Sequence, residues 1–142
     1  MLRRLLERLG LARIKPVGAR GEDAAAAYLR RAGYVILDRN VRVPVGEADI
    51  VAQLDSADGG RRTVVLVEVK TRTVDPAVKR PRAEEQVGAF KRRKLRAVMG
   101  HLVRSNPEWR GWRKRIDVVA VEFVNGESEP RVRHSVNAVG GF

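Results

Sequence analysis

The sequence predicts an α/β protein in which a mixed β-sheet is flanked by helices, with the elements in the order α-β-β-β-α-β. Two nearly continuous apolar segments, residues 63–70 and 115–123, are typical of strands that are buried on both faces. A long basic helical segment, residues 84–104, separates them. A helical crossover between two strands of one sheet places these strands parallel, with a right-handed connection. The earlier strands are joined by short turns, which predicts a hairpin or a meander.

The chain begins with a basic segment, residues 1–17, in which four leucines stand at helical spacing between arginines. This pattern is typical of an amphipathic arm or a short helix, and binding to a membrane surface is an alternative interpretation. The predicted globular domain, residues 18–142, opens with a helix over 18–33. Glu22 and Asp23 are expected in its first turn, where the helix dipole favours acids, and Gly33 is expected to end it in the left-handed conformation.

Three strands rich in β-branched residues follow this helix, and they are predicted over residues 34–43, 48–54 and 63–70. The first of them is expected to be interrupted near residues 38–40. A proline-containing basic loop, residues 71–85, then leads to the helix over 84–104. After the strand over 115–123, the segment 132–139 can add a short last strand.

The composition excludes several classes of protein. The 142 residues suit one domain, and a hydrophobic content of 44% is too high for a fully disordered chain. No uncharged apolar run is long enough to span a membrane. Because the chain has no cysteine, it can form neither a disulfide framework nor a zinc finger, and a cytoplasmic location is expected.

The positive charge is concentrated in one part of the chain. The formal net charge is +12, and residues 71–115 carry 14 Lys and Arg against four acids. A concentrated basic surface favours a polyanionic partner, most simply nucleic acid, because each neutralised phosphate releases counterions. The alternative is a coding bias, since only six of the 29 basic residues are lysines.

Charged residues inside the apolar strands predict the functional site. Side chains alternate along a strand, so Glu68 and Lys70 share one face, and so do Glu47 and Asp49 on the preceding strand. If the two strands pair, these groups cluster at one edge of the sheet. Burial of an unpaired charge is costly, so the group serves either a structural salt bridge or a bound ion and a reaction.

Two carboxylates and a lysine suit the metal-assisted cleavage of a phosphodiester bond. Mg²⁺ and Mn²⁺ prefer oxygen ligands and several waters, and such an ion polarises a phosphoryl oxygen and lowers the pKa of water. The lysine can orient or help deprotonate the attacking water, or neutralise charge that develops on the phosphate.

The ordered motifs of the chain resemble those of a known family. Asp49, an 18-residue spacer and then Glu68-Val69-Lys70 resemble the signature of PD-(D/E)xK nucleases, with Ala48 at the usual position of the proline. More closely, residues 18–140 resemble the YraN family of small bacterial proteins, which is akin to archaeal Holliday-junction resolvases. The motifs that carry this resemblance are GARGEDAAAAYLRRAGY, Asn40, GEADIVA, VEVKTR, Lys91 and RIDVVAV.

This resemblance implies a restriction-endonuclease-like fold with a defined metal site. Asp49 and Glu68 would be metal ligands, helped by the carbonyl of Val69, and Lys70 would be the catalytic lysine. Glu22 matches the helix acid that completes the metal site in the resolvase relatives. Alternatively, it is an acid near the start of a helix that only the helix dipole favours. Glu47 is either a further ligand or a turn residue.

The basic helix and the loop before it supply the candidate nucleic-acid contacts. Lys91 and Lys94 fall within or close to the apolar arc of the helix, so they either extend along the edge of the core or reach a bound phosphate. Arg92, Arg93 and Arg96 are expected to point away from the core, toward solvent or a nucleic-acid backbone. Arg72 belongs to the basic loop. Outside this set, Arg115 with Asp117 is expected to form an ion pair, the two tryptophans to pack in the core, and His134 to stand alone.

Two functional hypotheses follow. The first is a Mg²⁺- or Mn²⁺-dependent endonuclease that acts on DNA, including branched or junction DNA, with a homodimer as an open alternative. The second is an accessory protein that binds nucleic acid and keeps the fold with little or no catalysis. A membrane-surface or protein adaptor that uses the N-terminal segment is a third alternative.

Overall fold

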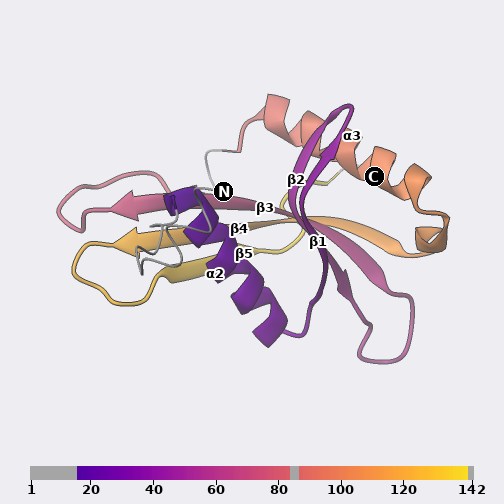
Figure 1. The fold of residues 1–142 in the computed structure, drawn as a ribbon, viewed down its shortest axis with the longest axis horizontal. Helices are drawn as coiled ribbons and strands as arrows, with labels where there is room; N and C mark the ends of the chain where they lie inside the picture. Colours follow the sequence, from indigo (N-terminus) through magenta and orange to yellow (C-terminus); the bar gives the residue numbers. More distant parts are fainter. Residues whose placement is uncertain (1–15, 84–86, 141–142) are drawn as a thin grey trace, which may run out of the picture.

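The structure, a computed structural model, describes residues 16–83 and 87–140, so the predicted N-terminal arm lies almost entirely outside the described residues. The elements follow the predicted order, with one strand added at the end (Figure 1). They are α2 (Val17–Arg31), β1 (Val35–Val43), β2 (Gly46–Leu54), β3 (Thr63–Val74), α3 (Ala89–Ser105), the 3₁₀ helix η2 (Pro107–Trp109), β4 (Arg113–Val124) and β5 (Arg131–Ser135). None of the described helices is long and apolar enough to cross a membrane.

The five strands form one mixed sheet in the order β1-β2-β3-β4-β5, which confirms the predicted fold class. β3 and β4 are parallel and pair without interruption from Thr63 with Arg113 to Val74 with Val124. All other neighbours are antiparallel. The connection from β3 to β4 contains α3, because parallel neighbours need a long crossover.

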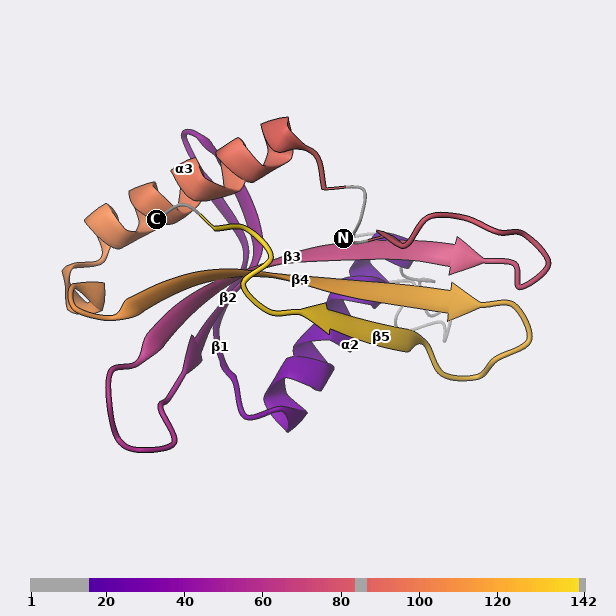
Figure 2. The same ribbon diagram turned by 180° about the vertical axis from the view of Figure 1, so that it is seen from behind.

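The two helices cover opposite faces of the sheet and produce two separate cores (Figures 1 and 2). Leu66 of β3 and Val118 of β4 pack against α3, whereas Val65 and Val119 pack against α2. This division follows from the alternation of side chains along each strand. Glu68 and Lys70 share the α3 face with Leu66, as the sequence predicts.

Several predicted boundaries are wrong. Residues 71–74 were expected in the basic loop but extend β3, because their pairing with β4 continues to Val74. α2 begins at Val17, so Glu22 and Asp23 lie beyond its first turn, which contains no acid. α3 begins at Ala89, with Gly88 as its N-cap, and the last strand ends at Ser135.

Two glycines have clear structural roles at α2. Gly33 follows the helix with a φ of +94°, which confirms the predicted left-handed position. Gly21 faces the sheet, where a Cβ would lie 2.7 Å from Cβ of Thr71 in β3 and still closer to its Oγ1. The helix therefore approaches the sheet as closely as it does because residue 21 has no side chain.

We expect Gly21→Ala to destabilise the fold by about 1–3 kcal/mol, the usual cost of overpacking a well-packed contact. The added methyl group must displace either Thr71 or the helix. Gly18→Ala is the matched control in the same helix, since a Cβ there meets nothing within 4 Å. The control should be neutral or more stable, because alanine favours the helix by up to about 1 kcal/mol. Urea unfolding of both variants tests this, and equal stabilities would contradict the role of Gly21.

Candidate functional site

The candidate site forms where β2 separates from β3. The pairing between these strands ends at Ile50 with Val67, although β3 continues to pair with β4 for seven further residues. Asp49, which precedes Ile50 in β2, accepts a hydrogen bond at Oδ2 from the backbone N–H of Val69, at 2.8 Å. A side chain thus replaces the missing strand-to-strand bond, which fixes the carboxylate of Asp49 against β3.

Glu68 lies beside this point and is almost completely buried, with 5% of its surface exposed. Nζ of Lys91, from α3, lies 3.3 Å from Oε1 of Glu68. Nζ of Lys70 lies 3.7 Å from the same oxygen. Lys91, which the sequence places within the apolar arc of its helix, thus reaches the buried carboxylate from across the α3 face.

Glu22 reaches the same region from α2. Its carboxylate lies close enough to Asp49 for the two charges to repel, and the side chain of Asn40 hydrogen-bonds it. Oε2 of Glu22 also lies 3.9 Å from Nη2 of Arg39. Asn40 has a φ of +52° and lies opposite Asp49, between the pairs of Arg39 with Ile50 and Val41 with Ala48. The sequence marks Asn40 as part of a motif but does not predict this contact, which depends on the packing of α2 against β1.

The pKa values of two carboxyl groups reflect this crowding. Burial and the negative charge of Asp49 raise the pKa of Glu68 above its ordinary value, and the ammonium groups of Lys91 and Lys70 offset part of this increase. The pKa of Glu22 is also raised, by burial and then by Asp49, against the opposing effects of Asn40 and Arg39. The negative charge of Asp49 therefore disfavours the ionised forms of both Glu22 and Glu68, and a bound cation would offset this repulsion.

The donors at this point suit a hydrated divalent cation. In an extended strand the N–H and C=O of one residue point to the same side, so the carbonyl of Val69, like its N–H, is directed toward Asp49 and away from β4. Asp49, Glu68 and this carbonyl offer the oxygen ligands that Mg²⁺ or Mn²⁺ prefers. Within residues 16–83 and 87–140, no three acidic or histidine side chains are close enough to hold a metal by themselves. A cation here would therefore keep several waters, as Mg²⁺ usually does.

Other predicted site residues lie elsewhere or have other partners. Glu47 is on the outer part of the β1–β2 hairpin, exposed, with Oε1 at 3.6 Å from Nε of Arg42. Lys94 is exposed and its Nζ lies 5.4 Å from the centre of the Phe90 ring. Arg72 lies further along β3, where its Nε binds Oε2 of Glu122 at 3.1 Å.

The arginines of α3 differ from one another. Arg93 is exposed. Arg92 donates hydrogen bonds to the carbonyls of Val87 and Ala138, and Arg96 donates one to the carbonyl of Gly140. Arg92 and Arg96 were expected to be solvated or to contact a nucleic-acid backbone. Arg92 is exposed as expected, and the guanidinium groups of both arginines also bind α3 to the C-terminal segment, residues 138–140.

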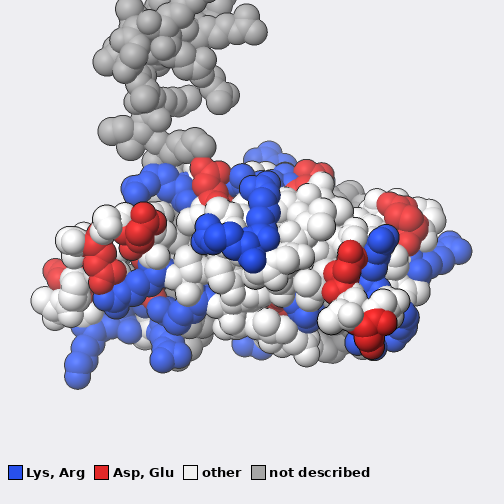
Figure 3. Space-filling view, turned by 90° about the horizontal axis from the view of Figure 1, so that it is seen from below, with Lys and Arg blue, Asp and Glu red and all other residues white. Residues whose placement is uncertain are grey.

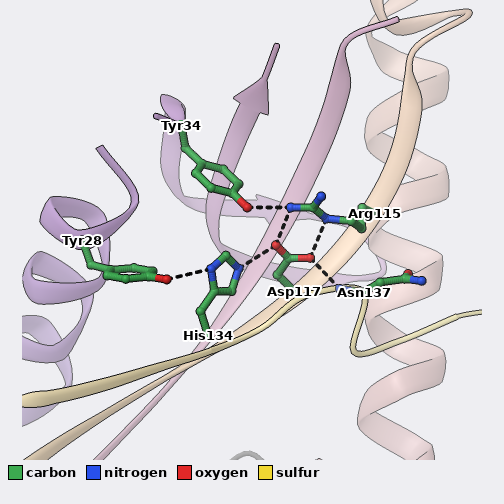
Figure 4. A network of polar contacts seen from close by, with 6 residues as sticks. All are labelled: Tyr28, Tyr34, Arg115, Asp117, His134 and Asn137. Atoms are coloured by element: carbon green, nitrogen blue, oxygen red, sulfur yellow. Dashed lines mark hydrogen bonds and ion pairs between the residues drawn. The ribbon is translucent and has the colours of Figure 1, made fainter. Parts of the chain in front are cut away.

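The opposite face of the sheet holds a buried polar network (Figure 4). Asp117 is completely buried and accepts hydrogen bonds from Arg115, from the N–H of Asn137 and, at 2.7 Å, from His134. The predicted ion pair of Arg115 with Asp117 is confirmed. His134 was expected to be isolated, and this is wrong, because the pairing of β5 with β4 brings it to Asp117.

Two tyrosines complete the network in Figure 4. The hydroxyl of Tyr28 lies 3.2 Å from Nδ1 of His134, and that of Tyr34 accepts a hydrogen bond of 2.7 Å from Arg115. Both tyrosines come from α2 or the residues just after it, so the network fastens the helix to β4 and β5. We interpret it as structural, since it is buried and lies on the face opposite Glu68.

The raised pKa of Glu68 predicts how stability depends on pH. Because this pKa lies above the ordinary value of 4.5, the folded protein keeps a proton over a pH range in which the unfolded chain has lost it. The free energy of unfolding therefore falls as pH rises through that range. Glu68→Gln cannot ionise, so its stability relative to the original protein should increase from pH 4.5 upward. Urea unfolding in EDTA at several pH values measures this difference, and a difference that is constant with pH would contradict it.

The fold and the site together define an α/β protein with a restriction-endonuclease-like core, in which acids and lysines meet where two strands separate. Comparison with known proteins then identifies the family. The model of the "Uncharacterised protein family UPF0102" matches residues 21–121. The chain belongs to this family, which is the YraN group that its motifs resemble.

Similar relatives extend over most of the chain. A UPF0102 protein from Syntrophotalea carbinolica is 43% identical over 114 residues, which cover 80% of this chain and 84% of the relative. One from Geobacter sulfurreducens is 41% identical over 126 residues, covering 87% and 88%. One from Mycolicibacterium gilvum is 40% identical over 124 residues, covering 87% and 93%.

Proposed function

We propose that the protein is a divalent-cation-dependent endonuclease that hydrolyses phosphodiester bonds in DNA, including branched or junction DNA. The observation that carries this proposal is the meeting of Asp49, Glu68, the Val69 carbonyl and Lys70 where β2 leaves β3. A buried salt bridge alone does not need a second carboxylate, because Glu68 already has two lysine partners.

Asp49, Glu68 and the carbonyl of Val69 would hold Mg²⁺ or Mn²⁺, with Glu22 close enough to contribute through water. When bound, the cation supplies Lewis-acid activation of the phosphate and makes water more acidic. Asp49 is held in place by the N–H of Val69 before any ligand arrives. Such preorganisation avoids the cost of reorienting the group during the reaction.

Lys70 would act on the reacting groups. It extends from the same face of β3 as Glu68, its side chain is a third exposed, and its Nζ lies 3.7 Å from Oε1 of Glu68. From there the ammonium can hydrogen-bond the attacking water or the phosphate oxygen on which negative charge increases. Lys91, from α3, favours the ionised form of Glu68 against the opposing effects of burial and Asp49, and its contact with Oε1 positions the carboxylate.

A nicking assay tests the proposal. Supercoiled plasmid and a four-way DNA junction are incubated with the purified protein in Mg²⁺, Mn²⁺ or EDTA. We expect cleavage in Mg²⁺ or Mn²⁺ that EDTA abolishes and that Asp49→Ala and Glu68→Ala lack, although both variants keep the circular-dichroism spectrum of the fold. Glu47→Ala is the matched control, since Glu47 is an exposed acid of the same strand as Asp49, and it should cleave normally.

The second candidate is a nucleic-acid-binding protein with little or no turnover. It is favoured by the two lysines that already neutralise Glu68 without a metal. In that case the protein would bind DNA in a salt-dependent manner, and the nicking assay would show no metal-dependent product. Cleavage that is equal in the original protein and in Asp49→Ala would also contradict the proposed active site.

A further inference from the structure

A basic groove lies on the same face of the sheet as Glu68, beyond the N-terminal end of α3. It has a volume of about 380 Å³ between the outer parts of β3, β4 and β5 and the loop that follows β3. Among residues 16–83 and 87–140, six basic side chains line it, and Glu122 is the one acid among the lining residues. We call this pocket the basic groove, and its basic residues are Arg72, Lys79, Arg80, Arg82, Arg131 and Arg133.

Two arginines of the basic groove are fixed by a buried acid. Glu122 of β4 is only 6% exposed, and it pairs with Arg72 from β3 and with Arg133 from β5. Two guanidinium groups thus share one carboxylate, which holds both in a defined position and leaves the floor of the groove positively charged. Arg131 lies at the rim, where it pairs with the exposed Glu127.

The outer wall of the basic groove consists of exposed cations. Lys79 and Arg80 lie in the loop after β3, and both are exposed. Figure 3 shows Lys and Arg side chains along the lower edge at the left end of the molecule, the end that carries this loop and the β4–β5 turn. The positive charge is therefore not consumed inside the fold, and it faces a ligand that comes from solvent.

The basic groove and the candidate site lie along the same face of β3. Every second side chain of β3 points to the face on which α3 lies, and these include Glu68, Lys70 and Arg72. Four residues of strand correspond to about 13 Å, at about 3.3 Å per residue. A nucleic-acid strand whose phosphate lies beside Lys70 would therefore reach the groove within a few nucleotides.

We propose that the basic groove binds the sugar–phosphate backbone of one nucleic-acid strand that leads away from the candidate site. Guanidinium groups that a carboxylate holds in place suit phosphate, because they present paired N–H donors in a fixed geometry. The small volume favours one strand over a duplex. The statement that this strand is the one being cleaved rests on the proposed function, whereas binding of the backbone does not.

Fluorescence anisotropy with a labelled single-stranded DNA oligonucleotide, in EDTA over a range of salt concentrations, tests the proposal. The variant Lys79→Ala with Arg80→Ala removes two exposed cations of the basic groove and leaves the Glu122 pairs intact. If both contact phosphates, the slope of log K against log salt falls by about 1.4, which corresponds to about 25-fold weaker binding at about 0.1 M salt. The matched control is Arg104→Ala with Arg110→Ala, two exposed arginines at the opposite end of the molecule, and it should keep the original slope.

The outcomes separate the two proposals. The proposal that the basic groove binds nucleic acid would be overturned by either of two results. One is no DNA binding by the original protein, and the other is an equal slope of log K against log salt for the groove variant and the original protein. If the original protein cleaves DNA and the groove variant cleaves with an unchanged KM, the proposed role of the groove in binding is wrong and the proposed function stands. If the groove variant loses binding as expected but the original protein never cleaves, the groove stands and the proposed function fails.

Discussion

Replacing Lys70 with alanine should lower the rate of metal-dependent DNA cleavage by roughly 100- to 1,000-fold, the usual effect of removing one preorganised donor to a developing negative charge. Lys70 can be lost without collapse of the site, since Lys91 still pairs with Glu68 at 3.3 Å. The variant should therefore fold, and it should bind Mn²⁺ as the original protein does, because Asp49 and Glu68 are unchanged. Single-turnover cleavage rates measure the first effect, and the Mn²⁺-induced increase in melting temperature measures the second.

The controls for Lys70 separate a catalytic lysine from a structural one. Lys114→Ala removes an exposed lysine that donates a hydrogen bond to the carbonyl of Trp112, and it should cleave at the original rate. Asp49→Asn should lose both cleavage and the Mn²⁺-induced increase in melting temperature. A Lys70→Ala protein that cleaves within about threefold of the original rate would show that Lys70 only balances the charge of Glu68.

Replacing Asp117 with alanine should destabilise the fold by about 3–5 kcal/mol, the usual effect of removing one partner from a buried ion pair. Asp117 is completely buried and is the common acceptor for Arg115, His134 and the N–H of Asn137. Without it, the guanidinium group of Arg115 keeps only its hydrogen bond to Tyr34. Asp55→Ala is the control, because Asp55 pairs with Arg62 at the surface, and such pairs contribute at most about 1 kcal/mol.

The effect of Asp117 should also depend on pH. Burial alone would raise the pKa of this carboxyl, but hydrogen bonds from His134, Arg115 and Asn137 outweigh burial and lower it below its ordinary value of 3.8. An acid with a lowered folded-state pKa stabilises the protein above the unfolded-state pKa, and this stabilisation is lost as pH falls through the folded-state value. The difference between the original protein and Asp117→Asn should therefore shrink below pH 3.8. Urea unfolding at neutral and acidic pH measures it, and a difference that grows in acid would contradict this account.

Most of the fold could be predicted because the apolar pattern of each segment agrees with the order in which strands and helices follow one another. The apolar strands around Leu66 and Val118 and the helix between them define a parallel pair, and the structure confirms it. The end of β3 was missed for a physical reason. Residues 71–74 contain polar and basic side chains typical of a loop, yet their backbone pairs with β4 as far as Val74, and this pairing cannot be seen in the local sequence.

The candidate site could be predicted in part. Strand alternation places Glu68 and Lys70 on one face, and the structure brings Asp49, Glu22 and Lys91 to the same region. Glu47 was grouped with Asp49 by the same alternation, but it lies beyond the point where β2 leaves β3, and it is exposed. The partners of His134 could not be predicted, because they depend on the register between β5 and β4.

The separation of β2 from β3 after Ile50 and Val67 has a consequence for how such a site could be switched off. One additional step of pairing would engage the amide and the carbonyl of Val69 in the sheet and displace the carboxylate of Asp49. The arrangement of the candidate site thus depends on the β2–β3 pairing ending at Ile50 and Val67. A change in the β1–β2 hairpin that extended this pairing would therefore remove the proposed metal ligands from position, although every charged group remained in the sequence.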